Sequence, residues 1–248
     1  MKNKNTALIT GASHRIGREM AIFLAQKGYD LVIHYNKSQA QATQLIEELK
    51  QLYNIDGATI DGDLSDKSSA QKIADFMCKK YPNWNLLINN SSIFHKSNFL
   101  DNLDEEFEKN LNIHLTSPLY LSHFFAKNVI SKKIKNAQII NMLDKNIARI
   151  DTVNFYYLLS KKFLAEFTKM LALEVAPHIR VNGIAPGYIL PEINAEAEYE
   201  KKIIPLIPLQ RIGNTKNIVQ TLEFLIENDF INGQILSIDG GASLNHAG

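Results

Sequence analysis

The sequence predicts an α/β protein with one doubly wound, seven-stranded parallel sheet and helices on both faces. Short apolar runs alternate with longer amphipathic segments along the whole chain, which is the pattern of repeated strand–helix–strand units. No internal repeat, low-complexity stretch or linker interrupts this alternation, so we expect residues 1–248 to form a single domain. The expected strands are Ala7–Thr10, Leu31–Tyr35, Ala58–Asp61, Leu86–Asn89, Gln138–Met142, Arg180–Ile184 and Gln234–Ile238.

The composition limits the classes of function. The chain has 248 residues, of which 45% are hydrophobic and 21% are charged, and its formal net charge is +1. This charge gives no basis for binding nucleic acid or an anionic membrane surface, and no apolar run reaches the roughly 18 residues of a membrane-spanning helix. The single Cys78 excludes an internal disulfide, and residues 1–5 lead directly into a strand rather than a signal segment. We therefore expect a cytoplasmic protein without nucleic-acid or membrane partners, and we assign no metal site.

A glycine-rich turn follows the first expected strand. Gly11 stands where the chain reverses, and Gly17 stands where the next helix must approach the strand. The N–H groups at the start of that helix would point at a pyrophosphate, as in other dinucleotide-binding sheets. Arg15 would add charge at the phosphates or at the substrate mouth, although it could also be a solvated residue at the helix start. The cofactor contacts expected in this turn are Gly11, Ser13, His14, Arg15 and Ile16.

The residues after the second expected strand indicate which nicotinamide cofactor binds. Sites for NAD place a carboxylate there, which binds the ribose and repels a 2′-phosphate. Residues 34–38 contain no acid, whereas Lys37 and Ser38 offer a charge and a hydroxyl to a phosphate. We therefore predict NADPH/NADP⁺ as the cofactor. The contacts expected in this segment are Tyr35, Asn36, Lys37 and Ser38.

Tyr157 and Lys161 form the expected centre of the chemistry. From about Asn154 the apolar spacing becomes helical, so these two side chains, four residues apart, project from one face of a helix. A phenol has an unperturbed pKa near ~10, and lowering it towards 7 requires about 4 kcal/mol of preferential phenolate stabilisation. An ammonium at ~4 Å supplies roughly that amount at an effective dielectric of about 20. We expect Tyr157 to donate a proton to a substrate that receives a hydride, with Lys161 lowering its pKa.

Four motifs stand in the order and spacing of a known family. They are the turn at residues 10–17, Asn89-Asn90-Ser91, the Tyr157/Lys161 pair and Pro186-Gly187-Tyr188. By these motifs the chain resembles the short-chain dehydrogenase/reductase family from Thr6 to about Leu244. The resemblance implies a Rossmann-type domain, a Lys161 that also holds the nicotinamide ribose, a mobile substrate lid at about residues 188–212, and a homotetramer. The further cofactor contacts that it implies are Asp63, Leu64, Asn90, Ser91, Ser92, Tyr157, Lys161, Pro186 and Gly187.

Asp144 gives the strongest indication of the substrate. It stands thirteen residues before Tyr157, where the usual family member has Ser. A hydroxyl suits a neutral carbonyl oxygen, whereas an acid suits a nitrogen heterocycle whose ring nitrogen takes a proton as the adjacent carbon takes the hydride. Together with Arg15, segment 34–38 and segment 113–118, Asp144 resembles the pteridine reductases, including the bacterial dihydromonapterin reductases. Alternatively, Asp144 caps the loop that follows it.

Two other positions allow two interpretations each. His114 stands where the family usually has Asn, which is thought to hold a water in the proton relay; His114 could titrate there, or it could be a buried structural histidine. Phe94 is either core packing or a stacking surface for an aromatic substrate. The expected catalytic residues are Asp144, Tyr157, Lys161 and His114. The expected substrate contacts are Arg15, Ser92, Phe94, Asp144, Tyr157 and Tyr188.

The expected function is NADPH-dependent reduction of a pterin such as dihydromonapterin or dihydrobiopterin, with dihydrofolate as a further candidate. Two alternatives are open. A short-chain carbonyl reductase of a 3-oxoacyl thioester, sugar or steroid would share the fold, but Asp144 in place of Ser argues against it. A non-catalytic NADP(H)-binding regulatory protein would not need Tyr157 and Lys161, and both are present.

Overall fold

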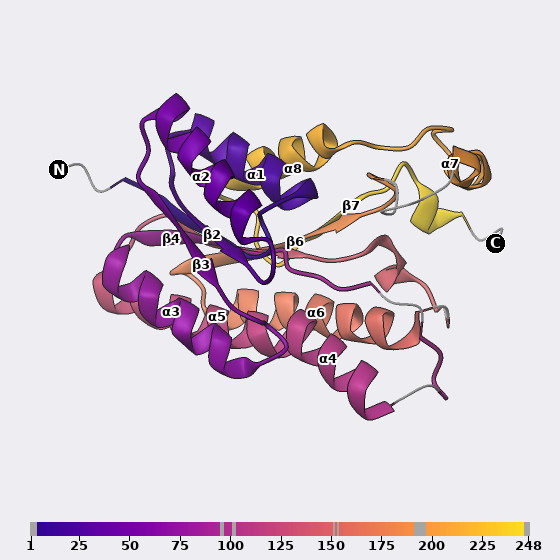
Figure 1. Cartoon of the computed structure of the whole chain (residues 1–248). Helices are drawn as coiled ribbons and strands as arrows, with labels where there is room; N and C mark the ends of the chain where they lie inside the picture. The colour runs from indigo at the N-terminus through magenta and orange to yellow at the C-terminus, as the bar shows by residue number, and fades with distance from the viewer. Residues whose placement is uncertain are drawn as a thin grey trace.

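A seven-stranded parallel sheet lies between two layers of helices (Figure 1). The structure is a computed structural model, and it describes residues 4–94, 97–100, 103–150, 152, 154–190 and 197–245. The strand order is β3-β2-β1-β4-β5-β6-β7, and each neighbouring pair is parallel. The strands are β1 (Thr6–Ile9), β2 (Asp30–Tyr35), β3 (Gly57–Asp61), β4 (Trp84–Asn89), β5 (Ala137–Met142), β6 (Ile179–Pro186) and β7 (Ile235–Ile238).

The strand order changes direction between β1 and β4. From β1 the chain moves outward through β2 to β3, returns to β4 on the other side of β1, and continues through β5 and β6 to β7. Connections that leave β1 and β4 in opposite directions open a crevice at the carboxyl ends of these strands, where doubly wound sheets bind their ligands. The predicted doubly wound α/β fold is confirmed.

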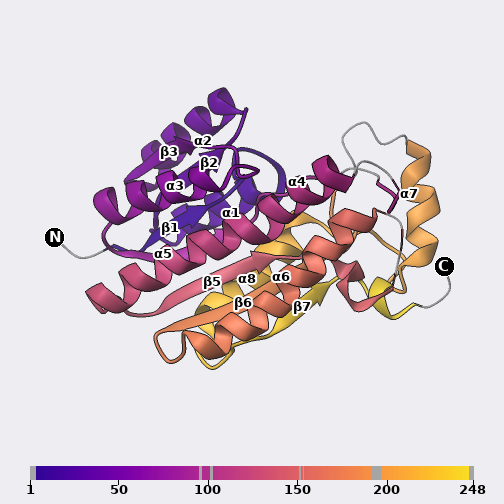
Figure 2. The same ribbon diagram turned by 90° about the horizontal axis from the view of Figure 1, so that it is seen from below.

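Helices cover both faces of the sheet (Figures 1 and 2). One face carries α1 (Arg15–Gln26), α2 (Gln39–Tyr53) and α8 (Thr215–Glu227), and the other carries α3 (Lys67–Lys80), α4 (Glu108–Leu111), α5 (Ser117–Lys132) and α6 (Phe155–Glu174). The short α7 (Ala197–Ile203) lies beyond one end of the sheet. No helix among the described residues is long and apolar enough to span a bilayer.

The central strands are buried on both faces, as expected for a parallel sheet covered by two helical layers, whereas the edge strands β3 and β7 are partly exposed. All four residues of β1 and all six residues of β4 are buried. The only tryptophan, Trp84, begins β4 and packs edge-on against Phe125 of α5, with ring centroids 4.9 Å apart. Its Nε1 donates to Leu86 O at 3.0 Å, so the buried indole N–H has a partner.

The observed strand bounds differ from the predicted ones by at most two residues. β4 begins at Trp84 rather than Leu86, and β6 ends at Pro186 rather than Ile184. The sequence did not indicate the two π-helical turns that flank α4, Leu103–Phe107 and Asn112–Thr116. Such turns are rare and occur often at functional sites. The second π-turn contains His114.

Candidate active site

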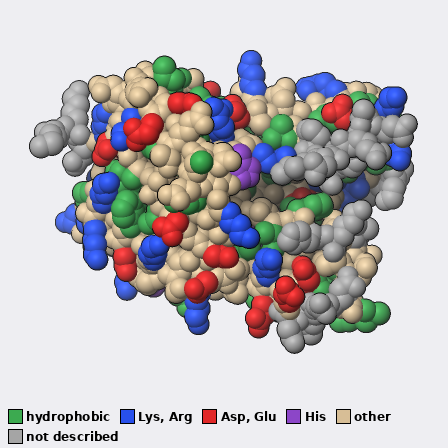
Figure 3. Space-filling view, viewed as in Figure 1, with side chains coloured by type: hydrophobic (Ala, Val, Ile, Leu, Met, Phe, Trp, Pro, Cys, Tyr) green, Lys and Arg blue, Asp and Glu red, His purple; other side chains and the backbone are tan. Residues whose placement is uncertain are grey.

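A cleft of about 580 Å³ lies where the loops leave the carboxyl ends of β1 to β4. Figure 3 shows the surface hollowed between the two helical layers. All of the cofactor contacts expected between residues 11 and 92 line this cleft, which brings four separate segments of the sequence together. They are Gly11, Ser13, His14, Arg15, Ile16, Tyr35, Asn36, Lys37, Ser38, Asp63, Leu64, Asn90, Ser91 and Ser92.

The glycine-rich turn is held in place by the end of β4. Gly11 has a φ of +63°, and a Cβ there would lie 2.9 Å from Ser91 Oγ and 3.0 Å from Ser91 Cα. A side chain at this position would therefore displace the chain. Asn90 Nδ2 donates to Thr10 O at 2.8 Å and to Gly11 O at 3.1 Å. The amide of Asn90 thus fixes the turn that forms one wall of the cleft.

The first N–H groups of α1 have no side-chain cap. Its N-cap residue, His14, makes no capping hydrogen bond, and its Nδ1 instead lies 2.8 Å from Ser13 Oγ. The start of the helix is therefore open to a phosphate, which the helix dipole also favours. Arg15 has a φ of +54°, a left-handed conformation that costs a residue with a side chain about 1–2 kcal/mol. Strain of this kind is typical of functional positions.

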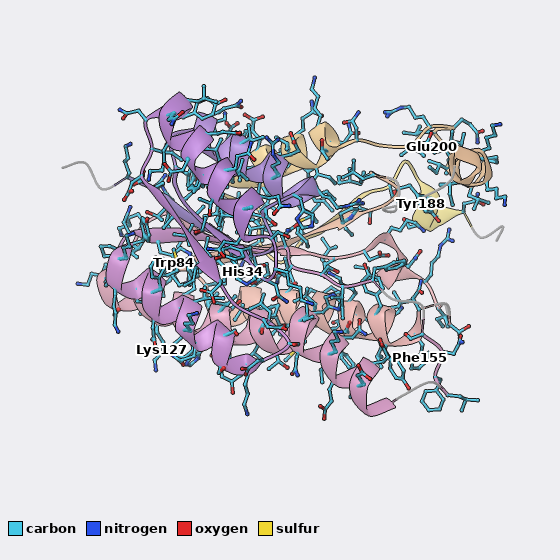
Figure 4. All side chains as sticks on the ribbon, viewed as in Figure 1. His34, Trp84, Lys127, Phe155, Tyr188 and Glu200 are labelled. Atoms are coloured by element: carbon cyan, nitrogen blue, oxygen red, sulfur yellow. The ribbon has the colours of Figure 1, made fainter. Side chains whose placement is uncertain are left out.

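His34 connects two walls of the cleft, a role that the sequence did not indicate. The N–H of Gly11 donates to His34 Nδ1 at 3.2 Å, so Nε2 carries the ring proton and donates to Gly62 O at 3.0 Å. The side chain is only 2% exposed, and burial lowers the pKa of His34 to about 4. Figure 4 shows His34 within the sheet region. Through its two hydrogen bonds the neutral imidazole fixes the distance between the glycine-rich turn and the loop after β3.

Asp63 lines the cleft and does not cap the next helix. Its Oδ1 accepts hydrogen bonds from Ser65 N at 2.9 Å and from Ser65 Oγ at 2.7 Å, and these bonds lower the pKa of Asp63. The cap of α3 is Asp66, which accepts from Ser68 N at 2.8 Å. Asp63 is therefore a charged acceptor at the rim of the cleft.

Asp144 and Tyr157 are in direct contact. Asp144 follows β5, and Tyr157 lies in the first turn of α6. Tyr157 Oη donates to Asp144 Oδ2 at 3.0 Å, while Asn146 N donates to Asp144 Oδ1 at 2.8 Å. The carboxylate therefore caps the short 3₁₀ turn Lys145–Ala148 with one oxygen and binds the phenol with the other. The capping interpretation of Asp144 is confirmed, and its role towards a substrate stays a prediction.

The expectation that Lys161 lowers the pKa of Tyr157 is wrong for this structure. Burial raises the pKa of Tyr157 well above its usual value, Asp144 raises it further, and only the hydrogen bond with Ser92 acts in the opposite direction. Lys161 Nζ lies 5.8 Å from the centroid of the Tyr157 ring and donates to Met142 O at 2.8 Å. Burial lowers the pKa of Lys161 itself to about 8, despite the charge of Asp144. Tyr157 therefore keeps its proton at neutral pH, because burial and the Asp144 carboxylate both raise its pKa.

The structure favours the structural interpretation of His114. Burial lowers the pKa of His114 well below its usual value, and the charge of Lys161 lowers it further. Ile93 N donates to His114 Nε2 at 3.3 Å, and Ser92 Oγ lies 2.9 Å from the same nitrogen. Since Nε2 accepts, Nδ1 carries the proton and donates to Ser160 Oγ at 2.8 Å. A neutral His114 links the loop after β4 to α6, and it does not titrate near neutral pH.

Phe94 lies at the open side of the Tyr157 ring. The two rings meet edge to face with centroids 4.9 Å apart, and Phe94 is 47% exposed. The interpretation as core packing is therefore wrong. The exposed face of Phe94 is free to lie against a flat ligand placed beside Tyr157.

Pro186 is the last residue of β6, and Gly187 and Tyr188 follow it. A Cβ on Gly187 would lie 2.6 Å from Asp239 Cβ, so the turn passes directly over the end of β7. Tyr188 also borders a larger hollow of about 820 Å³ between α8 and β7, which Tyr157 and Asp144 do not line. These two residues do not line the smaller cleft either, but Ser92, which does line it, hydrogen-bonds Tyr157 and so connects the Tyr157/Asp144 pair to the smaller cleft.

Several residues of the site were missed at the sequence level. Lys109 and Ile113 line the cleft from α4 and the following π-turn, and Ser160 is the partner of His114. Ser160 stands three residues after Tyr157, a helical spacing that could have indicated it, but the sequence held no signal for its contact with His114. Within the described residues, no group of three or more His, Cys, Asp or Glu side chains could hold a metal ion.

Comparison with known proteins defines the class to which this fold and site belong. A family model described as enoyl-(acyl carrier protein) reductase matches residues 11–243. The chain belongs to this family of short-chain dehydrogenases/reductases and is an oxidoreductase by class.

Individual similar proteins act on different kinds of substrate. The 3-oxoacyl-(acyl-carrier-protein) reductase FabG of Buchnera aphidicola subsp. Baizongia pistaciae is 31% identical over 243 residues, which cover 96% of this chain and 97% of that protein. FolM alternative dihydrofolate reductase 1 from Brucella canis, solved in complex with NADP, has a TM-score of 0.91 at 27% identity and covers 98% of this chain and 96% of its own. Acetoin dehydrogenase YohF from Salmonella typhimurium has a TM-score of 0.88 at 26% identity, with 98% of each chain covered. Overall similarity therefore does not select the substrate.

Proposed function

We propose that this protein is an NADPH-dependent reductase of a pterin ring, of the dihydromonapterin, dihydrobiopterin or dihydrofolate type. The observation that carries the proposal is the 3.0 Å hydrogen bond from Tyr157 Oη to the Asp144 carboxylate. A negative charge at this position opposes the oxyanion that develops when a ketone is reduced. The same charge favours a ring nitrogen that takes up a proton. Similarity to a FolM alternative dihydrofolate reductase supports the same substrate class.

The cleft fits NADPH. The uncapped start of α1 suits the pyrophosphate, and Arg15, Lys37 and Ser38 line the cleft where a 2′-phosphate needs cations and donors. The similar Brucella canis structure holds NADP. We assign Lys161 to the nicotinamide ribose and Pro186-Gly187 to the carboxamide side. Bound NADPH would supply the hydride.

The protein itself supplies the proton for the substrate and the charged side chains that stabilise the products of its transfer. Tyr157 holds its proton because burial and Asp144 raise its pKa. When a substrate nitrogen becomes basic, that proton can move from Tyr157 Oη to the nitrogen. Asp144 stabilises the protonated ring, and the buried Lys161 ammonium offsets the negative charge left on the phenolate. Phe94, which packs against the Tyr157 ring, would form one wall of the substrate site.

Turnover assays test this proposal. Purified protein is mixed with NADPH and either a 7,8-dihydropterin, dihydrofolate or an acetoacetyl thioester, and loss of NADPH absorbance is followed. We expect the dihydropterin to give the highest kcat/KM, and we expect Tyr157→Phe to lower that activity about 10²–10⁴-fold. Turnover of the thioester alone would contradict the pterin assignment but not the oxidoreductase class.

Reduction of a 3-oxoacyl thioester is the second candidate. It is favoured by the 31% identity to FabG over nearly the whole chain. Asp144 argues against it, because its negative charge opposes the oxyanion that develops on a ketone oxygen. The same assay separates the two functions.

We also propose that the protein is a homotetramer with a substrate lid at about residues 188–212. Exposed apolar side chains follow one another along α6, where Met170 is 70% exposed and Leu173 is 82% exposed. Such a row is typical of a helix that packs against another subunit. Light scattering should give four times the 28.0 kDa chain mass.

A further inference from the structure

Lys145 is a buried lysine to which the proposed chemistry gives no role. It follows Asp144 directly, and it is 8% exposed. A buried ammonium is stable only where polar or charged groups replace its water. Its Nζ donates to Asn146 Oδ1 at 2.7 Å and lies 4.9 Å from the centroid of the Tyr188 ring. The ammonium therefore connects the turn that begins at Asp144 to the residue that follows β6.

The end of β7 supplies the opposite charge. Asp239 accepts from Gly241 N at 3.0 Å and from Ser243 N at 2.7 Å. Burial acts to raise the pKa of Asp239, but these hydrogen bonds outweigh it, and the charge of Lys145 adds to the lowering. A Cβ on Gly187 would lie 3.4 Å from Lys145 Cδ, so the lysine stem runs directly beneath the Gly187 turn. Lys145 thus lies between the ends of β5, β6 and β7.

Tyr188 lies where both ends of segment 188–213 meet (Figure 4). Its carbonyl oxygen accepts from Gly213 N at 2.9 Å. A Cβ on Gly213 would lie 2.7 Å from Ile189 Cδ1, so the outgoing and returning chains are in close contact. The two ends of the segment are therefore joined to each other at Tyr188 and Ile189.

We propose that Lys145 is a positioning residue that sets the Tyr188 ring, and with it both ends of segment 188–213, relative to Asp144. This proposal rests on the proposed function in one respect, because that function makes Asp144 and Tyr188 contact the same substrate. Lys145 acts by cation–π attraction to Tyr188 and by charge pairing with Asp239. It touches neither substrate nor cofactor.

The first test does not depend on activity. Lys145→Met keeps the length and apolar stem of the side chain and removes the charge. Lys162→Met is the matched control, because Lys162 Nζ donates to Ile147 O at 2.9 Å and to Arg149 O, and so ties down the same turn without touching Tyr188. Hydrogen–deuterium exchange is measured on peptides that contain residues 187–190 and Gly213. We expect exchange there to rise about five- to tenfold in Lys145→Met and to stay unchanged in Lys162→Met.

The second test uses kinetics on whichever substrate the wild type reduces. Lys145→Met should raise the substrate KM by roughly five- to tenfold, with the Kd for NADPH unchanged, and Lys145→Arg should recover most of the loss. In a Tyr188→Leu background, Lys145→Met should raise KM no further. Additive effects of the two changes, or equal exchange in the Lys145 and Lys162 variants, would overturn the proposal. Failure of the dihydropterin assay would leave the exchange result standing.

Discussion

Asp144→Ser separates the chemical role of the carboxylate from its structural role. Asp144 uses Oδ1 to cap the turn through Asn146 N and uses Oδ2 to bind Tyr157 Oη. Serine is also a good capping residue, so the turn should survive, and the free energy of unfolding should change by less than about 1 kcal/mol. What the substitution removes is the charge beside the phenol.

The expected size of the loss in kcat/KM follows from the role of the Asp144 charge in the reaction. If Asp144 favours the protonated ring nitrogen, kcat/KM for a dihydropterin should fall about 10²–10⁴-fold, the usual range for an acid–base group. Reduction of a model ketone should be unchanged or faster, because the carboxylate no longer opposes the oxyanion. Asp144 also raises the pKa of Tyr157. Its removal lowers that pKa, and since Tyr157 works in its protonated form, activity should be lost at a lower pH on the alkaline side.

The assay is steady-state kinetics of wild type and Asp144→Ser on both substrates across an alkaline pH series. Thermal unfolding of each protein serves as the control for the cap. Equal losses on dihydropterin and ketone would show that Asp144 acts only through the turn. An alkaline limb that does not move would show that Asp144 does not set the pKa of Tyr157.

Four further outcomes are expected. Arg15→Gly should raise the melting temperature by about 2–4 °C, because glycine relieves the strain of the left-handed backbone, and it should weaken turnover. Arg15→Ala should weaken turnover without raising the melting temperature. The pKa of His34 falls from 6.5 to about 4 on folding, so its contribution to stability is present above pH 6.5 and is lost as the pH falls towards 4. Wild type should therefore lose about 3 kcal/mol more than His34→Gln in urea unfolding over that range, and parallel curves would contradict this. Lys37→Asp should weaken use of NADPH and spare NADH, whereas equal wild-type kcat/KM for both cofactors would refute the cofactor assignment. Tyr157→Phe should keep NADPH binding, measured by fluorescence titration, and lose about 10²–10⁴-fold in kcat; near-full activity would leave Asp144 as the sole acid.

Local patterns were sufficient to predict the fold. Each strand was located to within two residues, because buried parallel strands are continuous apolar runs and the helices between them are amphipathic. The π-turn at Asn112–Thr116 could not be found this way. Its register depends on contacts of His114 with Ser92 and Ser160, which lie in other parts of the chain.

The site was predicted less completely than the fold. Spacing placed Tyr157 and Lys161 on one helical face, and their side chains do lie near each other. The sign of the pKa shift on Tyr157 was predicted wrongly, because it depends on burial and on which oxygen of Asp144 faces the phenol. Lys145 and Tyr188 are 43 residues apart, and only the pairing of β5 with β6 brings them together.

Trp84 is the only tryptophan of the chain, so indole fluorescence reports on one known position. The indole is fully buried at the start of β4, whereas the cleft lies beyond the other end of that strand, about 17 Å away along the chain. Its emission should shift to the red when the core opens and should be insensitive to substitutions around Asp144. One optical signal can therefore compare the unfolding of every variant on the same scale, independently of what each variant does to catalysis.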